Sequence, residues 1–132
     1  MGNAAYKRVN FEQVRSATLI NVMDASDQDV LIEGTTPCAV EISVVEKALA
    51  SRTPIVIYGR NDHDDRIFSK YEQIRKLGGD PHLYVGGMFE WLLLQDIYGP
   101  DLFPTTTKTL DLLKYKQLGI KNSTINNGGR RD

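Results

Sequence analysis

A run of polar and charged side chains follows an apolar segment in the stretch PIVIYGRNDHDD, residues 54–65. Residues 55–58 are β-branched or aromatic, which predicts a buried strand, and the apolar spacing after the loop predicts a helix. α/β proteins commonly bind ligands in a loop of this kind. The loop contains carboxylates, an imidazole and guanidinium groups for metal, proton or anion chemistry, but it has no thiol or hydroxyl nucleophile. The candidate site residues are Gly59, Arg60, Asn61, Asp62, His63, Asp64, Asp65 and Arg66.

A metal site formed by His63 and its neighbouring aspartates is the first alternative. Adjacent residues on a short loop rarely all point at one ion, and His82 is distant in the sequence. The acids have a simpler role at the start of the next helix, where Asp64 or Asp65 suits the N-cap position. We therefore expect no metal and no other cofactor. Phosphatase chemistry around Arg66 would need a cysteine in the loop, so it is rejected too.

Cys38 is the only cysteine in the chain. It follows Pro37 in residues 30–42, a stretch with the composition of a short, buried, extended segment that turns at Gly34. A free cysteine in such a segment usually acts as a small hydrophobic residue, and no basic residue within three positions favours its thiolate. We expect Cys38 to be structural. The alternative is that its thiol lies close enough to the loop to act as a nucleophile.

Helix signals occur on both sides of the loop. Asn10 with Gln13, and Ser43 with Glu46, have capping-box spacing. A helix after Gly86 and Gly87 is unusually apolar, so we expect it and its Trp91 to be well buried. The helix after the loop has an apolar stripe made of Ile67, Phe68, Tyr71, Ile74 and Leu77.

Strand patterns alternate with these helices and span residues 18–24, 55–58 and 82–85. Such alternation predicts an α/β fold, a mostly parallel sheet with helices on both faces. The 132 residues fit one domain, which we place at residues 11–116. We expect residues 1–10 to be a flexible N-terminus and residues 117–132 to be a polar, disordered tail.

Composition indicates an ordinary globular protein, with 41% hydrophobic and 25% charged residues. The net charge of -1 gives no electrostatic reason to expect nucleic acid binding. No stretch approaches the roughly 20 apolar residues that span a membrane, and no apolar signal-peptide core follows the N-terminus. With a single cysteine no internal disulfide can form, so we expect a cytoplasmic protein.

Five motifs then point to a family: LINVMD, LIEGTTPCAVEI, PIVIYGRNDHDD, KLGG and LYVGGMFEW. In this order and at these distances they resemble the rhodanese-like domain, from Phe11 to Trp91. Gly86 and Gly87 followed by Trp91 are the most specific element. The segments FEWLLLQDIYG and FPTT are similar to a divergent branch of the family from protists and large DNA viruses. The resemblance implies a single rhodanese-like domain.

The resemblance also implies where the chemistry would lie. In active rhodaneses the strand that matches residues 55–58 ends at a cysteine whose thiolate carries a sulfane sulfur as a persulfide. Backbone N–H groups of the following loop form a cradle for this sulfur and the incoming anion. The position that matches the cysteine is Gly59, whereas Arg60 matches a common loop arginine. The family's strand-end acid and arginine fall on Asn21 and Met23.

The loop differs from the family in charge as well. Asp62, Asp64 and Asp65 stand where glycine and basic or hydroxyl residues are usual, and like charges there repel an anionic donor. We therefore expect a catalytically inactive rhodanese-like module, not an enzyme, that binds or regulates a protein partner through residues 59–66. The alternative is a rhodanese-like sulfurtransferase of unusual mechanism, using thiosulfate or another sulfane sulfur donor through Cys38.

The N-terminal sequence MGNAAYKR raises one question about membranes. Gly2 has the position of an N-myristoylation site, and Lys7 and Arg8 could add attraction to anionic lipid. Tyr6 stands where that motif has Ser or Thr, so we favour an ordinary terminus. Membrane contact is expected only if Gly2 is myristoylated.

Overall fold

Three parallel strands form the sheet of the domain. The computed structural model describes residues 6–108 and 111–116. The strands are β1 (Thr18–Asn21), β2 (Ile55–Tyr58) and β3 (Pro81–Tyr84), in the order β1-β2-β3. All four residues of the central strand β2 are buried, which explains its apolar run: a parallel strand covered on both faces meets no water.

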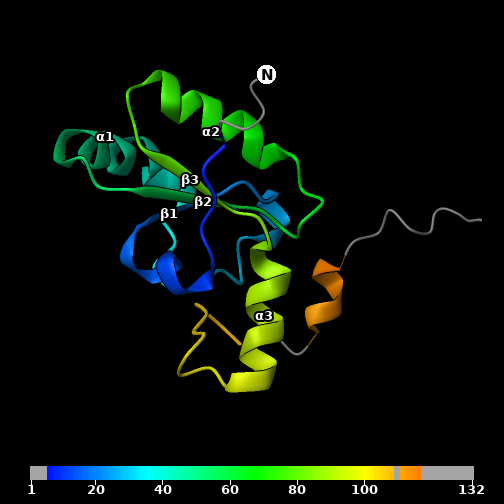
Figure 1. The fold of residues 1–132 in the computed structure, drawn as a ribbon. Helices are drawn as coiled ribbons and strands as arrows, with labels where there is room; N and C mark the ends of the chain where they lie inside the picture. Colours follow the sequence, from blue (N-terminus) through cyan, green and yellow to red (C-terminus); the bar gives the residue numbers. More distant parts are fainter. Residues whose placement is uncertain (1–5, 109–110, 117–132) are drawn as a thin grey trace, which may run out of the picture.

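Helices cover both faces of this sheet (Figure 1). α1 (Glu41–Ser51) and α2 (Arg66–Lys76) pack on one face through apolar residues such as Val45 and Tyr71. α3 (Gly87–Tyr98) and the 3-10 helix η2 (Phe11–Ser16) pack on the other, with Trp91 and Val14 in the same apolar cluster. The predicted α/β architecture, a parallel sheet between two layers of helices, is confirmed.

One of the two capping motifs is confirmed and the other is wrong. Asn10 and Gln13 exchange side-chain-to-backbone hydrogen bonds at the start of η2. α1 instead begins at Glu41, and the Ser43 hydroxyl donates to Val40 O at 3.0 Å. A serine inside the first turn can bond back to a carbonyl, so its spacing alone does not identify the helix start.

The domain begins earlier than the sequence suggested. Residues 6–9 belong to the stretch expected to be a flexible terminus, yet they pack against β3 and α2. Val9 N donates to Leu83 O at 2.9 Å, and Leu83 N donates to Lys7 O at 2.8 Å. The Tyr6 ring contacts two aromatic rings of α2 edge-on, with centroid distances of 4.9 and 5.0 Å.

Burial decreases towards the helix ends. Trp91 is 1% exposed, as predicted, but Ile97 and Tyr98 at the end of α3 are 67% and 60% exposed. Leu77, assigned to the apolar stripe of α2, is also 64% exposed, so its assignment to the core is wrong. A four-residue strand spans only about 13 Å, whereas the 12 residues of α3 span about 18 Å. The helix therefore extends beyond the sheet that could bury it.

Two predictions fall outside the described residues. Gly2, the myristoylation candidate, and the tail at residues 117–132 are not described, so the expectations about them stay predictions. Within residues 6–108 and 111–116, no helix combines the length and the apolarity that crossing a bilayer requires.

Candidate functional site

The loop of residues 59–66 lies at the carboxyl end of the central strand and leads directly into α2. Its first carbonyl binds the start of α3, because Gly59 O accepts a hydrogen bond from Met88 N at 2.9 Å. Gly87 has a φ of 66°, and a Cβ built on it would lie 2.6 Å from Gly59 O. The positive φ favours glycine, and no Cβ fits this close to Gly59 O. Gly87 therefore allows α3 to begin against the loop.

Asp64 turns its carboxylate into the interior of the loop. Its Oδ2 accepts the Arg60 backbone N–H at 2.8 Å, and its Oδ1 accepts the Arg66 backbone N–H at 3.3 Å. The Arg66 guanidinium binds both oxygens, Nε to Oδ1 at 2.8 Å and Nη2 to Oδ2 at 2.7 Å. Only 6% of the Asp64 side chain is exposed. The loop thus binds a carboxylate of its own with the backbone N–H groups that could hold an external anion.

Electrostatics favour the charged form of this carboxylate. Burial acts to raise the pKa of Asp64, but the hydrogen bonds from Arg66 and from Arg60 N, together with the Arg66 charge, outweigh it and hold the pKa below its ordinary value. The same pair raises the pKa of Arg66, with a further contribution from Asp24, whose Oδ1 lies 2.8 Å from Arg66 Nη1. The anion in the loop is therefore permanent at neutral pH.

Gly59 has no room for a side chain in this arrangement. A Cβ built on it would lie 2.5 Å from Asp64 Oδ2 and 2.7 Å from Asp64 Cγ, closer than real Cβ contacts. Asp64 therefore fills the space that a side chain at residue 59 would enter.

The other two aspartates face away from this interior. The side chains of Asp62 and His63 are 53% and 65% exposed, and His63 Nδ1 lies 3.1 Å from Asp62 Oδ1. Asp65 is exposed at the N-cap of α2. The sequence suggested that the three aspartates act together to repel an anion. In the structure only Asp64 lies inside the loop, so this expectation is wrong. Among residues 6–108 and 111–116, no three His, Cys, Asp or Glu side chains are grouped so that they could hold a metal ion.

The side chains of Arg60 and Asn61 form a second side of the loop, which contacts distant segments of the chain. Arg60 Nη1 donates to Asp27 Oδ2 at 2.6 Å, and Asp27 is only 5% exposed. Asn61 Oδ1 accepts His63 N at 2.9 Å, which fixes the amide so that its Nδ2 points out of the loop. Asp27 lies 33 positions before Arg60 in a polar stretch that gave no signal of a site.

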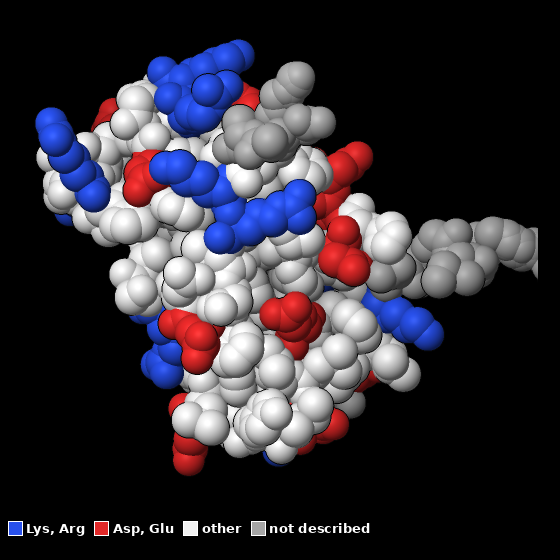
Figure 2. Space-filling model, in the orientation of Figure 1, with Lys and Arg blue, Asp and Glu red and all other residues white. Residues whose placement is uncertain are grey.

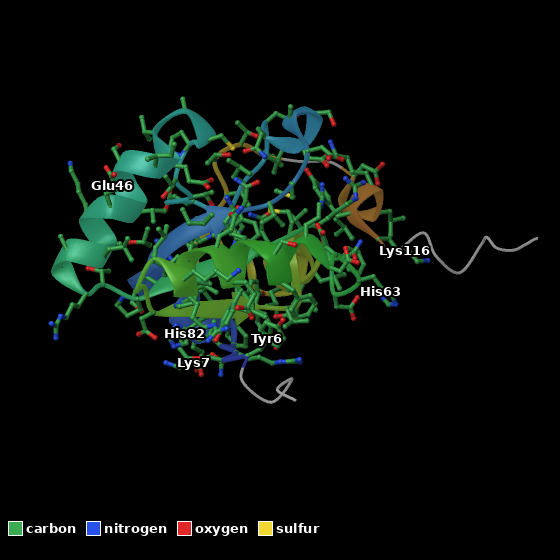
Figure 3. The ribbon with its side chains drawn as sticks, turned by 90° about the horizontal axis from the view of Figure 1, so that it is seen from above. Tyr6, Lys7, Glu46, His63, His82 and Lys116 are labelled. Atoms are coloured by element: carbon green, nitrogen blue, oxygen red, sulfur yellow. The ribbon has the colours of Figure 1, made fainter. Side chains whose placement is uncertain are left out.

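The C-terminal 3-10 helix η5 (Leu112–Tyr115) contacts this side of the loop. Arg60 Nη2 donates to Lys114 O, and Asn61 Nδ2 donates to Tyr115 O at 2.8 Å. Figure 3 shows His63 and Lys116 at the same end of the molecule, with Glu46 of α1 at the other. The sequence gave no indication of this contact, because 54 positions separate its partners.

Cys38 is exposed, so its expected burial in an extended segment is wrong. The extended segment ends earlier, because Thr36 N pairs with Leu19 O and the buried Thr35 hydroxyl bonds to Tyr58. Pro37 then precedes the 3-10 helix η4 (Cys38–Val40), which turns the thiol outwards.

The thiol contacts an acceptor at the end of β1. Cys38 Sγ lies 3.5 Å from Gln28 Oε1, and Gln28 Nε2 donates to Asn21 Oδ1 at 2.7 Å and to Met23 O at 3.1 Å. Because Gln28 Nε2 is the donor in these two bonds, its Oε1 is the amide atom that faces the Cys38 sulfur. The Gln28 carbonyl oxygen therefore acts as the acceptor in this contact. The Asn21 side chain also accepts Met23 N at 3.0 Å, which turns the chain and ends β1 before residue 24, its predicted end.

Charge is unevenly distributed over the surface. On the face seen in Figure 2, Lys and Arg atoms gather over the upper part, where α1 and α2 lie, and Asp and Glu atoms predominate below. Two lysines form ion pairs within the domain, Lys7 with Asp80 at 2.9 Å and Lys70 of α2 with Glu41 at 2.6 Å.

No family model, curated protein or solved structure matches the chain significantly. Function must therefore be inferred from the residues and the geometry of the loop.

Proposed function

We propose that this chain is a catalytically inactive, rhodanese-like binding module that recognises a protein through the outward face of residues 59–66. The observation that carries the proposal is the Asp64 carboxylate, which accepts the Arg60 and Arg66 backbone N–H groups and fills the space beside Gly59. Sulfur transfer requires a thiolate beside an open anion cradle. Here the position of the thiolate is a glycine and the cradle holds an internal anion.

The outward face has the properties of a recognition surface. Asp62 and His63 are more than half exposed, and Asp65 is exposed at the start of α2. A rigid base holds them in place, because Arg66 and the backbone fix the loop through Asp64. An acidic, exposed and well-supported loop suits a basic segment of a protein partner, since complementary charge speeds encounter and excludes wrong partners.

The experiment compares the proteins captured by the native chain with those captured by Asp62→Asn/Asp65→Asn. Asp64 stays unchanged, because its carboxylate supports the loop. Glu46→Gln, an exposed acid at the far end of the molecule, is the matched control. We expect a set of proteins that the native chain and the Glu46→Gln variant retain and the double variant loses. The same set on all three chains would contradict the proposal.

Sulfur transfer through Cys38 is the second candidate, and the exposure of the thiol is the observation in its favour. Cys38 also lies at the same edge of the sheet as the loop, since Gln28 links it to Asn21 at the end of β1. The experiment is an assay of sulfur transfer from thiosulfate to cyanide by the native chain and by Cys38→Ser. Turnover that disappears in the variant would establish the enzyme; absence of turnover in both supports the binding module.

A further inference from the structure

The last described residues of the chain contact the loop through two main-chain carbonyls and one aromatic side chain. Arg60 Nη2 donates to Lys114 O, and Asn61 Nδ2 donates to Tyr115 O at 2.8 Å. The Tyr115 side chain is fully buried, and the Arg60 guanidinium carbon lies 5.1 Å from the centre of its ring. Two side chains of the loop thus hold two main-chain carbonyls and one aromatic ring.

The remaining side chains of the segment contribute less to this contact. Leu113 is 63% exposed, and Lys114 and Lys116 are exposed as well. Leu112 is partly buried against the same apolar cluster as Tyr115. Hydrogen bonds to main-chain carbonyls can be made to any sequence, whereas a buried aromatic anchor selects one. This division of roles is the usual one in the recognition of short peptides.

The groups that hold the segment are positioned by the domain itself. Asp27 fixes the Arg60 guanidinium through a 2.6 Å contact, and His63 N fixes the Asn61 amide. These residues follow β1 and β2, at the carboxyl edge of the parallel sheet, where α/β proteins place their ligands. Arg60 and Asn61 thus each have a hydrogen bond within the domain besides the one to the segment.

The resident tyrosine fits this position imperfectly. Within the described residues its hydroxyl is buried without a hydrogen-bond partner. Burial raises the pKa of Tyr115 to about 12, with further contributions from Asp27 and Asp29. A buried hydroxyl without a partner weakens the fit, so a ring that lacks it should bind better.

We propose that residues 111–116 occupy in cis a peptide site formed by Arg60, Asn61 and Asp27, whose partner is a protein segment with an aromatic anchor flanked by lysines. The proposal rests on the proposed function and names the chemistry of the partner. Lys116 lies at the same end of the molecule as His63 of the loop (Figure 3), and Lys114 Nζ lies 5.2 Å from the centre of the Tyr115 ring. With the exposed acids of the loop nearby, this placement favours basic residues beside the anchor. Residues 111–116 then act as an internal competitor that the partner must displace.

Internal competition has a measurable consequence. A tethered segment has an effective concentration in the millimolar range, and the apparent affinity for an external peptide falls with the fraction of sites that it occupies. Removal of the aromatic anchor from the chain should therefore increase the affinity for an external peptide by at least about tenfold. Removal of an aromatic side chain from an unrelated part of the core would not increase the affinity for the peptide.

The experiment measures the fluorescence anisotropy of labelled peptides with the full chain. One peptide has the sequence DLLKYK of residues 111–116, a second has phenylalanine in place of the tyrosine, and a third has alanine there. We expect Tyr115→Ala to bind the first two at least about tenfold more tightly than the native chain, and the third not at all. Asn61→Ala in the Tyr115→Ala background should abolish binding. The proposal is overturned if a folded Tyr115→Ala chain binds the peptides no more tightly than the native chain. It is also overturned if adding Asn61→Ala leaves the affinity of the Tyr115→Ala chain unchanged.

A second measurement uses the native chain, in case Tyr115→Ala does not fold. The second peptide, with phenylalanine in place of the tyrosine, is added in excess to the isotope-labelled native chain. The signals of the native chain are then followed by NMR. Displacement of the segment should shift the side-chain amide signals of Asn61 and the backbone signals of Lys114 and Tyr115; unchanged signals at saturating peptide overturn the proposal. Loss of peptide binding together with continued partner capture through Asp62 and Asp65 would reject this inference and leave the proposed function standing.

Discussion

Asp64 Oδ2 lies 2.5 Å from the position that a Cβ on Gly59 would occupy. The two residues are therefore coupled: the glycine makes room for the carboxylate, and the carboxylate binds the Arg60 N–H that an anionic ligand would otherwise use. A side chain at residue 59 therefore requires Asp64 to move or to be replaced.

Gly59→Cys alone will not create a sulfurtransferase, because its Cβ would contact three atoms of Asp64 at 2.5, 2.7 and 2.9 Å. A thiol beside this carboxylate would also lose thiolate character. In Gly59→Cys/Asp64→Gly the space and the Arg60 N–H are both free, so we expect a more reactive thiol. Alkylation rates across pH and sulfur transfer from thiosulfate compare the two variants. Strong activity in the single variant would show that Asp64 moves aside easily.

The native chain will show no sulfur transfer from thiosulfate to cyanide. Gly59 follows β2 without a thiol, and the Asp64 carboxylate accepts the Arg60 N–H that an anionic sulfur donor would need. Steady-state assays with the native chain and Cys38→Ser test this prediction. A rate above background that the serine variant lacks would contradict it.

Asp64→Asn will destabilise the fold in a pH-dependent way. Since the pKa of Asp64 is lowered in the folded state, its contribution is complete above the ordinary pKa of about 4 and is lost as pH falls through the folded-state pKa. We expect a loss of about 1–3 kcal/mol in the free energy of unfolding at pH 7. The difference from the native chain should shrink as the pH falls below about 4. Urea denaturation at several pH values measures it, and a difference that is constant with pH would exclude a charge effect.

Gly87→Ala will destabilise the fold more than Gly34→Ala. Both glycines have positive φ, 66° and 91°, so alanine strains the backbone at each by about 1–2 kcal/mol. A Cβ at Gly34 has nothing within 4 Å, whereas one at Gly87 lies 2.6 Å from Gly59 O. The excess loss in Gly87→Ala, measured by urea denaturation, reports the contact between α3 and the loop. Equal losses would show that α3 can shift without cost.

Trp91→Ala will lower the free energy of unfolding by about 3–5 kcal/mol, as large truncations in a packed core do. The Trp91 side chain is 1% exposed, and the substitution also removes the hydrogen bond that its indole N–H donates to Pro104 O. Tyr98→Ala in the same helix is the matched control, because this ring is 60% exposed and its loss should cost much less. Similar effects of both changes on the denaturation midpoint would mean that Trp91 contributes little to the core.

Local patterns in the sequence determined the elements of this fold. The apolar run of β2 and its alternation with helices predicted a parallel sheet, because a strand covered on both faces excludes polar residues. The Asn10 capping box and the burial of Trp91 also follow from neighbours within a few positions. The loop at residues 59–66 was likewise visible as a polar segment between a strand and a helix.

Tertiary structure alone decided what the loop contains and what it contacts. Sequence spacing could not show that Asp64 points inward while Asp62 and Asp65 point out. The direction of each side chain depends on the backbone conformation of the loop, and residue spacing does not specify that conformation. Nor could it show Asp27 at Arg60 or Tyr115 at Asn61, which lie 33 and 54 positions apart. Such contacts depend on where the packing of α3 and the sheet brings distant segments, and no local propensity encodes that placement.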